Sequence, residues 1–168
     1  MLAPIFAALS FSSLALSAAL DRRVDDTAIW PVTELNVHYS DNNSSASTLE
    51  FIVEWSRGTA TCATSFPFNQ LPTNNIYCDE TARNPSFNLT ATKDGIFNET
   101  AFTLNVKGSV RITTQMSHLY KATQEILANS PGSADEYLEC TDQADGVQCG
   151  LAKPLNLTAE YTNPYTSA

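Results

Sequence analysis

Basic residues are scarce in this chain. It has 9 Lys and Arg against 18 Asp and Glu, for a formal net charge of −9. After the Arg22-Arg23 pair, the basic residues are scattered singly along the sequence. Nucleic-acid-binding surfaces need clustered Lys and Arg, and anionic membrane surfaces repel an acidic protein for the same electrostatic reason. We therefore expect no nucleic-acid partner and no membrane partner, and we attribute the acidity to solubility.

Motifs of catalysis and metal binding are also missing. The sequence contains no Gly-x-Ser-x-Gly, no glycine-rich phosphate loop and no Cys-x-x-Cys, and the acidic stretch 135–145 lacks the spacing of a calcium loop. His38 and His118, the two histidines, are isolated, and we interpret them as strand residues facing solvent. We expect no enzymatic activity, no cofactor and no metal. A hydrolase that uses only two carboxylates is kept as an alternative, because the chain is rich in acids.

Long apolar runs are limited to the first residues. Met1 to Ala19 carries no charged side chain and ends in Ser17-Ala18-Ala19, the small-residue pattern that signal peptidase cleaves. We predict a signal peptide over 1–19 and a secreted, extracellular protein. Arg22-Arg23, in the segment 20–28, is either a second processing site or an ordinary solvated pair. No later run is long enough for a membrane-spanning helix.

Cysteines are few but even in number. Cys62, Cys78, Cys140 and Cys149 predict two disulfides in an oxidising compartment. We pair Cys62 with Cys78 and Cys140 with Cys149, because the members of each pair are close in sequence. The second pair also frames a hairpin that turns at Asp145-Gly146.

Asn-x-Ser/Thr sequons begin at five positions. In the strands that we predict, period-two alternation places each Asn opposite the apolar residues, where a glycan would fit. We expect occupancy at three of these sites and at one of the two adjacent ones. The three are Asn88, Asn98 and Asn156, and the adjacent pair is Asn42 and Asn43.

Short β-prone runs separated by turn signals fill the rest of the chain. They predict an all-β fold: a single antiparallel β-barrel or sandwich domain over 29–161 with two local disulfides, followed by a frayed tail over 162–168. We predict a strand over 96–106, a turn at Lys107-Gly108 and a further strand over 109–116. Residues 117–129 are ambiguous, and their apolar spacing favours a helix slightly over a strand.

Aromatic residues offer the best candidate contacts. Trp30, Phe66 and Phe68 lie near chain segments that we expect at edges or in a long connection, and they suit a ligand or partner site. The alternative is that they fill the core, as aromatics of β-rich domains usually do. For Trp55 we favour the core.

The chain resembles the Alternaria major-allergen family of secreted fungal proteins. The resemblance rests on Ile29-Trp30-x-Val32, Leu49-x-Phe51, Tyr77-Cys78 and the late hairpin from Cys140 to Val147-Gln148-Cys149-Gly150. It covers about Ile29 to Tyr161. It implies an antiparallel β-barrel, the same cysteine pairing and a strand over 117–127. It implies no disulfide-linked dimer, because Leu20 to Thr61 contains no cysteine.

Three hypotheses of function follow from these observations. The resemblance implies a non-enzymatic effector, elicitor or allergen-like protein that acts through protein–protein contact, with host plant extracellular proteins as partners. The exposed aromatics would suit an extracellular carbohydrate-binding module, with glycans as ligands. A carboxylate-dependent hydrolase is the third.

Overall fold

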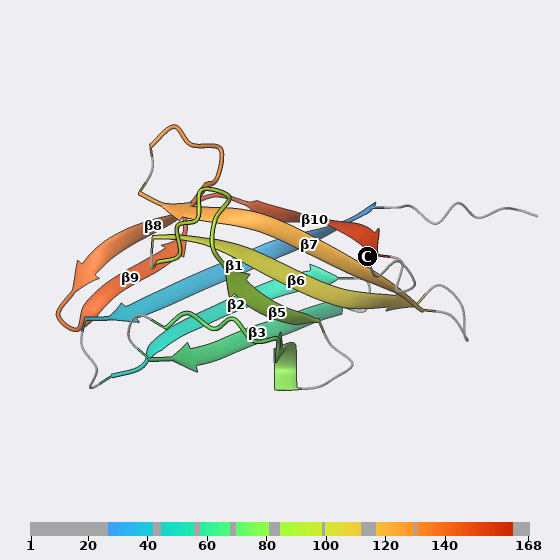
Figure 1. The fold of residues 1–168 in the computed structure, drawn as a ribbon, viewed down its shortest axis with the longest axis horizontal. Helices are drawn as coiled ribbons and strands as arrows, with labels where there is room; N and C mark the ends of the chain where they lie inside the picture. Colours follow the sequence, from blue (N-terminus) through green and yellow to red (C-terminus); the bar gives the residue numbers. More distant parts are fainter. Residues whose placement is uncertain are drawn as a thin grey trace, which may run out of the picture.

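The computed structural model describes residues 27–41, 45–55, 58–67, 70–80, 85–98, 100–111, 117–129 and 131–162. The predicted signal peptide, the Arg22-Arg23 pair and nearly all of the predicted C-terminal tail lie outside these residues. Within them, the chain forms one ten-stranded sheet and one short 3-10 turn (Figure 1). The all-β prediction is confirmed.

The strands follow one another through short connections. The first five are β1 (Thr27–Ser40), β2 (Ser47–Trp55), β3 (Gly58–Phe66), β4 (Ile76–Tyr77) and β5 (Ser86–Thr90), with the 3-10 turn η1 (Cys78–Glu80) after β4. The last five are β6 (Ala101–Arg111), β7 (Ser117–Ala128), β8 (Glu136–Gln143), β9 (Gly146–Leu151) and β10 (Leu155–Thr162).

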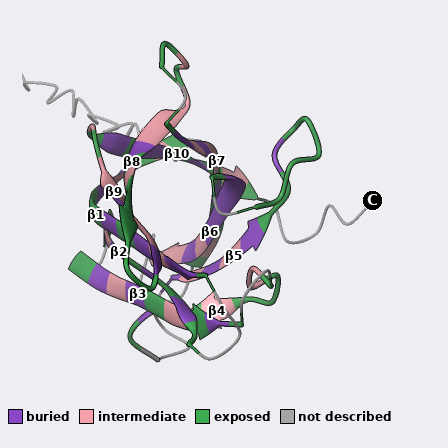
Figure 2. Cartoon of the chain, turned by 90° about the vertical axis from the view of Figure 1, so that its left-hand side faces the viewer, coloured by how far each residue is buried: buried purple, intermediate pink, exposed green. Residues whose placement is uncertain are grey.

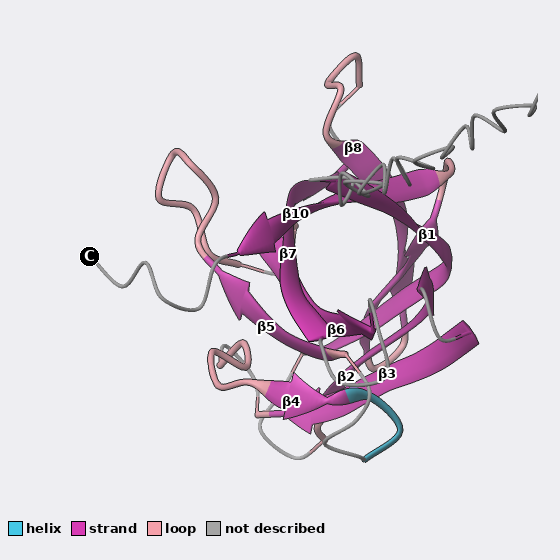
Figure 3. Ribbon diagram, turned by 90° about the vertical axis from the view of Figure 1, so that its right-hand side faces the viewer, coloured by secondary structure: helices cyan, strands magenta, loops and turns pink. Residues whose placement is uncertain are grey.

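The sheet curls into a barrel around a packed interior. The order of strands is β3-β2-β1-β9-β8-β7-β6-β5-β4, and β10 also lies between β1 and β7. The start of β1 pairs with β10, and its end pairs with β9. All these pairs are antiparallel except a short parallel contact between β7 and β8. Seen along its axis, the sheet forms a ring of strands (Figures 2 and 3).

Buried side chains fill this ring. They include Trp30, Phe51, Phe87 and Phe102, which are all fully buried, and the Phe51 and Phe87 rings meet edge to face with centroids 5.0 Å apart. This contact joins β2 to β5, which are not neighbours in the sheet, across the interior. Burial of such apolar side chains contributes about 1.5–3 kcal/mol each to folding.

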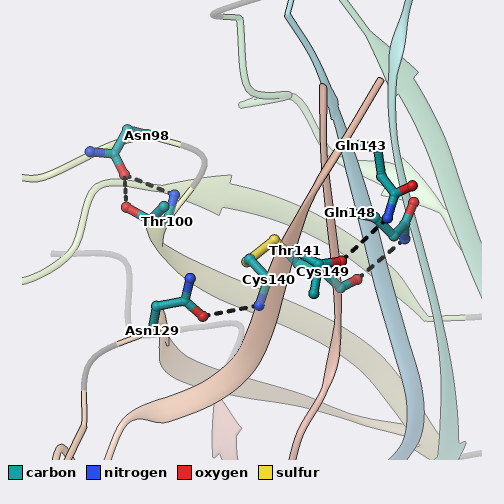
Figure 4. The surroundings of a disulfide bond; sticks show 8 residues. All are labelled: Asn98, Thr100, Asn129, Cys140, Thr141, Gln143, Gln148 and Cys149. Carbon is teal, nitrogen blue, oxygen red and sulfur yellow. Dashed lines mark hydrogen bonds between the residues drawn. A yellow bond between two sulfur atoms is a disulfide. The ribbon is translucent and has the colours of Figure 1, made fainter. Parts of the chain in front are cut away.

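Two disulfides reinforce the sheet, and both have the predicted pairing. Cys62 is bonded to Cys78, and Cys140 to Cys149. Cys140 and Cys149 are direct partners across β8 and β9, and the Cys140 N–H also donates to Asn129 Oδ1 at 3.0 Å (Figure 4).

Three predictions about single elements need comment. The segment 117–128 is the strand β7, so the helical interpretation was wrong and the strand implied by the resemblance is correct. The turn predicted at Lys107-Gly108 is also wrong, because β6 runs through it. Residues 96–98 and Thr100 lie outside the strands and precede β6, with one isolated bridge from Asn98 to Ala101, instead of beginning a strand. The described part of the chain contains no helix that is long and apolar enough to cross a membrane.

Candidate functional site

A cavity of about 720 Å³ opens at one end of the barrel. This end is formed where β1, β3 and β8 finish and β2 and β9 begin, and it faces the viewer in Figure 2. The β3–β4 connection and the loop before β6 add the rest of the lining. Its described lining residues are Tyr39, Ser40, Asp41, Ser47, Phe66, Gln70, Leu71, Phe97, Asn98, Gly146 and Val147.

Aromatic rings supply the apolar wall of the cavity. Tyr39 of β1 and Phe66 of β3 meet edge to face, with centroids 6.3 Å apart and planes at 67°. Both are buried against the barrel core, and Phe97, on the loop before β6, lines the same cavity. Small-molecule and peptide sites are usually built in this way, from an apolar wall with a few polar groups around it.

The polar groups of the cavity are held by local hydrogen bonds. The Ser40 N–H donates to Ser47 Oγ at 3.1 Å, and the Ser40 and Ser45 hydroxyls are 2.7 Å apart. The Asp41 N–H donates to the Asp145 carbonyl at 3.2 Å. These bonds tie the β1–β2 connection to the β8–β9 turn, so the polar rim is positioned before anything binds.

An apolar loop stands beside the cavity. We call residues Thr92–Asn98 the Phe97 loop; it projects between β5 and β6 (Figure 2). Ile96 is 46% exposed and Phe97 is 37% exposed, so the loop presents two large apolar side chains that are adjacent in sequence. The Ile96 N–H donates to Thr92 Oγ1 at 3.0 Å, and the Thr92 N–H donates to the Ile96 carbonyl at 2.7 Å.

Lys93 fastens the Phe97 loop to the barrel. Its Nζ lies 3.4 Å from Glu125 Oε2 in β7 and 3.8 Å from Asp135 Oδ2. The hydrogen bond and negative charge of Glu125, with the charge of Asp135, raise the pKa of Lys93 above its usual value. The loop is therefore an ordered turn that presents two apolar side chains to solvent.

The three aromatic residues predicted as ligand or partner contacts do not share one site. Phe66 lines the cavity, but it is only 5% exposed and also packs in the core, which was the alternative kept for it. Trp30 does not fit this role, because it is only 1% exposed and faces the core, where its ring lies against Gly108. Phe68 lies outside the described residues. Trp55 is in the core, as expected.

Two of the three described sequons sit on the outside of strands, as predicted. Asn88 and Asn156 alternate with buried apolar neighbours in β5 and β10. Asn98 is exposed as expected, but it lies in a loop, and its neighbour Phe97 is not a core residue. Asn42 and Asn43 fall outside the described part of the chain.

The two histidines are less exposed than predicted. His38 is mostly shielded, and its Nε2 lies 3.7 Å from Asp145 Oδ2. His118 packs its ring on Tyr161, with centroids 4.5 Å apart, so it does not simply face solvent. The described residues contain no group of three or more His, Cys, Asp or Glu that would hold a metal ion. Asp41 is the one carboxylate among the described cavity residues.

Sequence reasoning missed Tyr39 and Phe97 as site residues. Phe97 falls in the strand that we predicted over 96–106, and we predicted no role for Tyr39. The Phe97 loop turns at Lys93-Asp94-Gly95, where Gly95 has φ +78°, a conformation that favours glycine.

No protein-family model matches the chain, and no match was found among curated proteins or solved structures. The resemblance to the Alternaria major-allergen family therefore stays a prediction.

Proposed function

We propose that this protein is a secreted, non-enzymatic effector or elicitor that acts by binding an extracellular host protein through the cavity end of the barrel. The observation that carries the proposal is the Phe97 loop. Ile96 and Phe97 are exposed side by side, next to an aromatic-walled cavity, on a turn that Lys93 and Thr92 hold in place. Exposed apolar side chains on a preorganised loop are typical of the centre of a protein interface.

Preorganisation supports a role in binding. An ordered loop loses little conformational freedom when it is buried, so more of its contact energy appears as affinity. Two acidic residues, Asp41 and Asp145, lie together at the cavity end of the barrel and favour one orientation of a charged partner. A partner with basic residues around an apolar patch would complement this end.

The two disulfides support the extracellular part of the proposal. Bonds of this kind persist in oxidising compartments and are rare in the cytosol. The signal-peptide pattern of 1–19 points in the same direction.

Infiltration of purified, oxidised protein into leaf tissue tests the proposal. We expect a defence response that is absent with protein whose disulfides have been reduced and alkylated. Wild-type protein made without glycans that folds, keeps both disulfides and evokes no response would overturn the proposed function.

Carbohydrate binding is the second candidate, and Phe66 is the observation that favours it. Because Trp30 is buried, the candidate ring for sugar stacking is Phe66 in the cavity wall, and Gln70 and Asn98 line the same cavity. Binding on a glycan array that is lost in Phe66→Ala and kept in Ile29→Ala would favour this function. Ile29 is a suitable control because it is exposed on β1 and does not line the cavity.

A further inference from the structure

One predicted glycosylation site belongs to the cavity itself. Asn98 is the acceptor of the sequon Asn98-Glu99-Thr100, and it is among the residues that line the cavity. Phe97, the apolar residue that we assign to partner contact, precedes it directly. Any group attached to Asn98 would therefore stand at the cavity mouth.

The side chain of Asn98 is held in an orientation that leaves its nitrogen available. Its Oδ1 accepts two hydrogen bonds from Thr100, one from the N–H at 3.0 Å and one from the hydroxyl at 3.1 Å (Figure 4). Within the described structure, Nδ2 makes no hydrogen bond and Asn98 is exposed. Nδ2 is the atom to which an N-linked sugar is attached.

The other described sequons differ in this respect. Asn88 Nδ2 donates to the Thr73 carbonyl at 3.2 Å, and the side chain is half-buried, so a sugar there would stand against the neighbouring chain. Asn156 is exposed, but it pairs with Pro31 near the start of β1. Tyr39 lies eight residues further along β1, about 27 Å away, so a glycan on Asn156 is remote from the cavity.

We propose that Asn98 carries an N-linked glycan that covers the cavity and Phe97 and so controls access to the binding end of the barrel. The glycan is transferred from a lipid-linked oligosaccharide donor. A bond forms between Nδ2 and C1 of the first sugar, while the bond from C1 to the lipid pyrophosphate breaks. The amide loses one proton, and the pyrophosphate oxygen keeps the electron pair.

The inference rests on the secreted part of the proposed function, because only an exported chain meets the glycosylation machinery. It adds regulation to the same site. Molecules with the Asn98 glycan keep the binding end shielded, and molecules without it expose Phe97 and the cavity wall.

The test compares variants of the full-length protein secreted from a glycosylating eukaryotic host. Asn98→Gln and Thr100→Ala each remove the sequon by a different change, and Thr100→Ser keeps it. Asn156→Gln removes the remote sequon. Glycopeptide mass spectrometry establishes occupancy at Asn98. Nile red, an uncharged apolar dye that the acidic rim does not repel, then reports cavity access by fluorescence.

We expect a glycan on the Asn98 peptide of the wild type and of Thr100→Ser. Nile red fluorescence should rise severalfold in both Asn98→Gln and Thr100→Ala, and should stay at the wild-type level in Thr100→Ser and Asn156→Gln. Thermal unfolding identifies any variant whose fold has loosened, and enzymatic deglycosylation of native wild-type protein then supplies the same comparison without a mutation.

An unmodified Asn98 peptide would overturn the inference, and so would equal dye fluorescence with and without the glycan. A dye response that follows the Asn98 glycan, in a protein whose unglycosylated form evokes no leaf response, would reject the proposed function and leave the glycan's control of the cavity standing. The two failures are thus distinguishable.

Discussion

Cys62 and Cys78 are joined across the two ends of the sheet. Cys62 lies in β3, the strand at one end of the hydrogen-bonded order, and Cys78 follows β4, the strand at the other end. The Thr61 N–H donates to Asp79 Oδ1 at 3.0 Å beside the same seam. In the described strand order, no backbone hydrogen-bond ladder joins β3 to β4. The disulfide therefore links the two ends of the sheet covalently.

Removal of this bridge should cost more than removal of the other one. The separations are 16 residues for Cys62–Cys78 and 9 for Cys140–Cys149. Loop entropy alone predicts losses of about 3 kcal/mol and about 2.5 kcal/mol. The difference should grow because β8 and β9 remain hydrogen-bonded without their bridge. Urea unfolding of the two double Cys→Ala variants measures this, and a larger loss for the hairpin bridge would contradict it.

A side chain at Gly108 should disrupt the core. A Cβ built there would lie 3.1 Å from Trp30 Cη2 and 3.2 Å from Trp55 Cε3. We expect Gly108→Val to destabilise the fold by about 1–3 kcal/mol through overpacking. Since the chain has 2 tryptophans, intrinsic fluorescence reports directly on this contact. Lys107→Val is the matched control on the opposite face of β6, and an equal spectral change in both variants would argue against this packing.

Gly146 should tolerate no side chain. It has φ +147°, and a Cβ there would collide with the Tyr39 carbonyl oxygen of β1. Gly146→Ala is expected to cost about 2 kcal/mol or more. Gly95→Ala is the control, because φ is +78° there but no atom is nearby; it should cost about 1 kcal/mol. Equal losses in thermal unfolding would show that the contact with Tyr39 is unimportant.

The Phe97 loop should loosen at alkaline pH. The interactions with Glu125 and Asp135 raise the pKa of Lys93 above its ordinary value of 10.5. Because this pKa is raised in the folded protein, the ion pairs of Lys93 stabilise the loop fully below pH 10.5. This stabilisation is lost as the pH rises through the pKa that Lys93 has in the folded protein. The methyl resonances of Ile96 should therefore shift only above pH 10.5, toward their positions in Lys93→Met. A shift that is complete below that pH would contradict the assignment.

The sequence predicted those parts of the fold in which apolar and polar residues alternate strictly, or in which the interacting residues are close along the chain. Leu155 to Thr158 alternates strictly and forms β10 with its Asn outward. The disulfides followed from proximity along the chain, and the Asp145-Gly146 turn from glycine chemistry. In each case one local rule was enough.

The parts that were missed depend on contacts between distant residues. β1 has a register shift between Val32 and Glu34, so Trp30 and Leu35 both face inward although strict alternation would separate them. Gly108 looked like a turn residue, but it stays in β6 because tryptophans from β1 and β2 need the space above it. No local pattern contains that information.

The candidate site was predictable only in part, for the same reason. Phe66 was identified, but the cavity also needs Tyr39 from β1 and Phe97 from the loop before β6, which meet only after the barrel closes. Trp30 was misplaced because composition does not tell a core tryptophan from an exposed one.

The most direct measurement is the dose of protein that evokes a half-maximal defence response in leaf tissue. The protein is made without glycans, in an oxidising bacterial compartment. We predict that Phe97→Ser raises this dose at least tenfold. Ile29→Ser, which changes an exposed apolar residue near the start of β1, should leave the dose unchanged. Equal doses for wild type, Phe97→Ser and Ile29→Ser would contradict the claim that the cavity end of the barrel makes the contact.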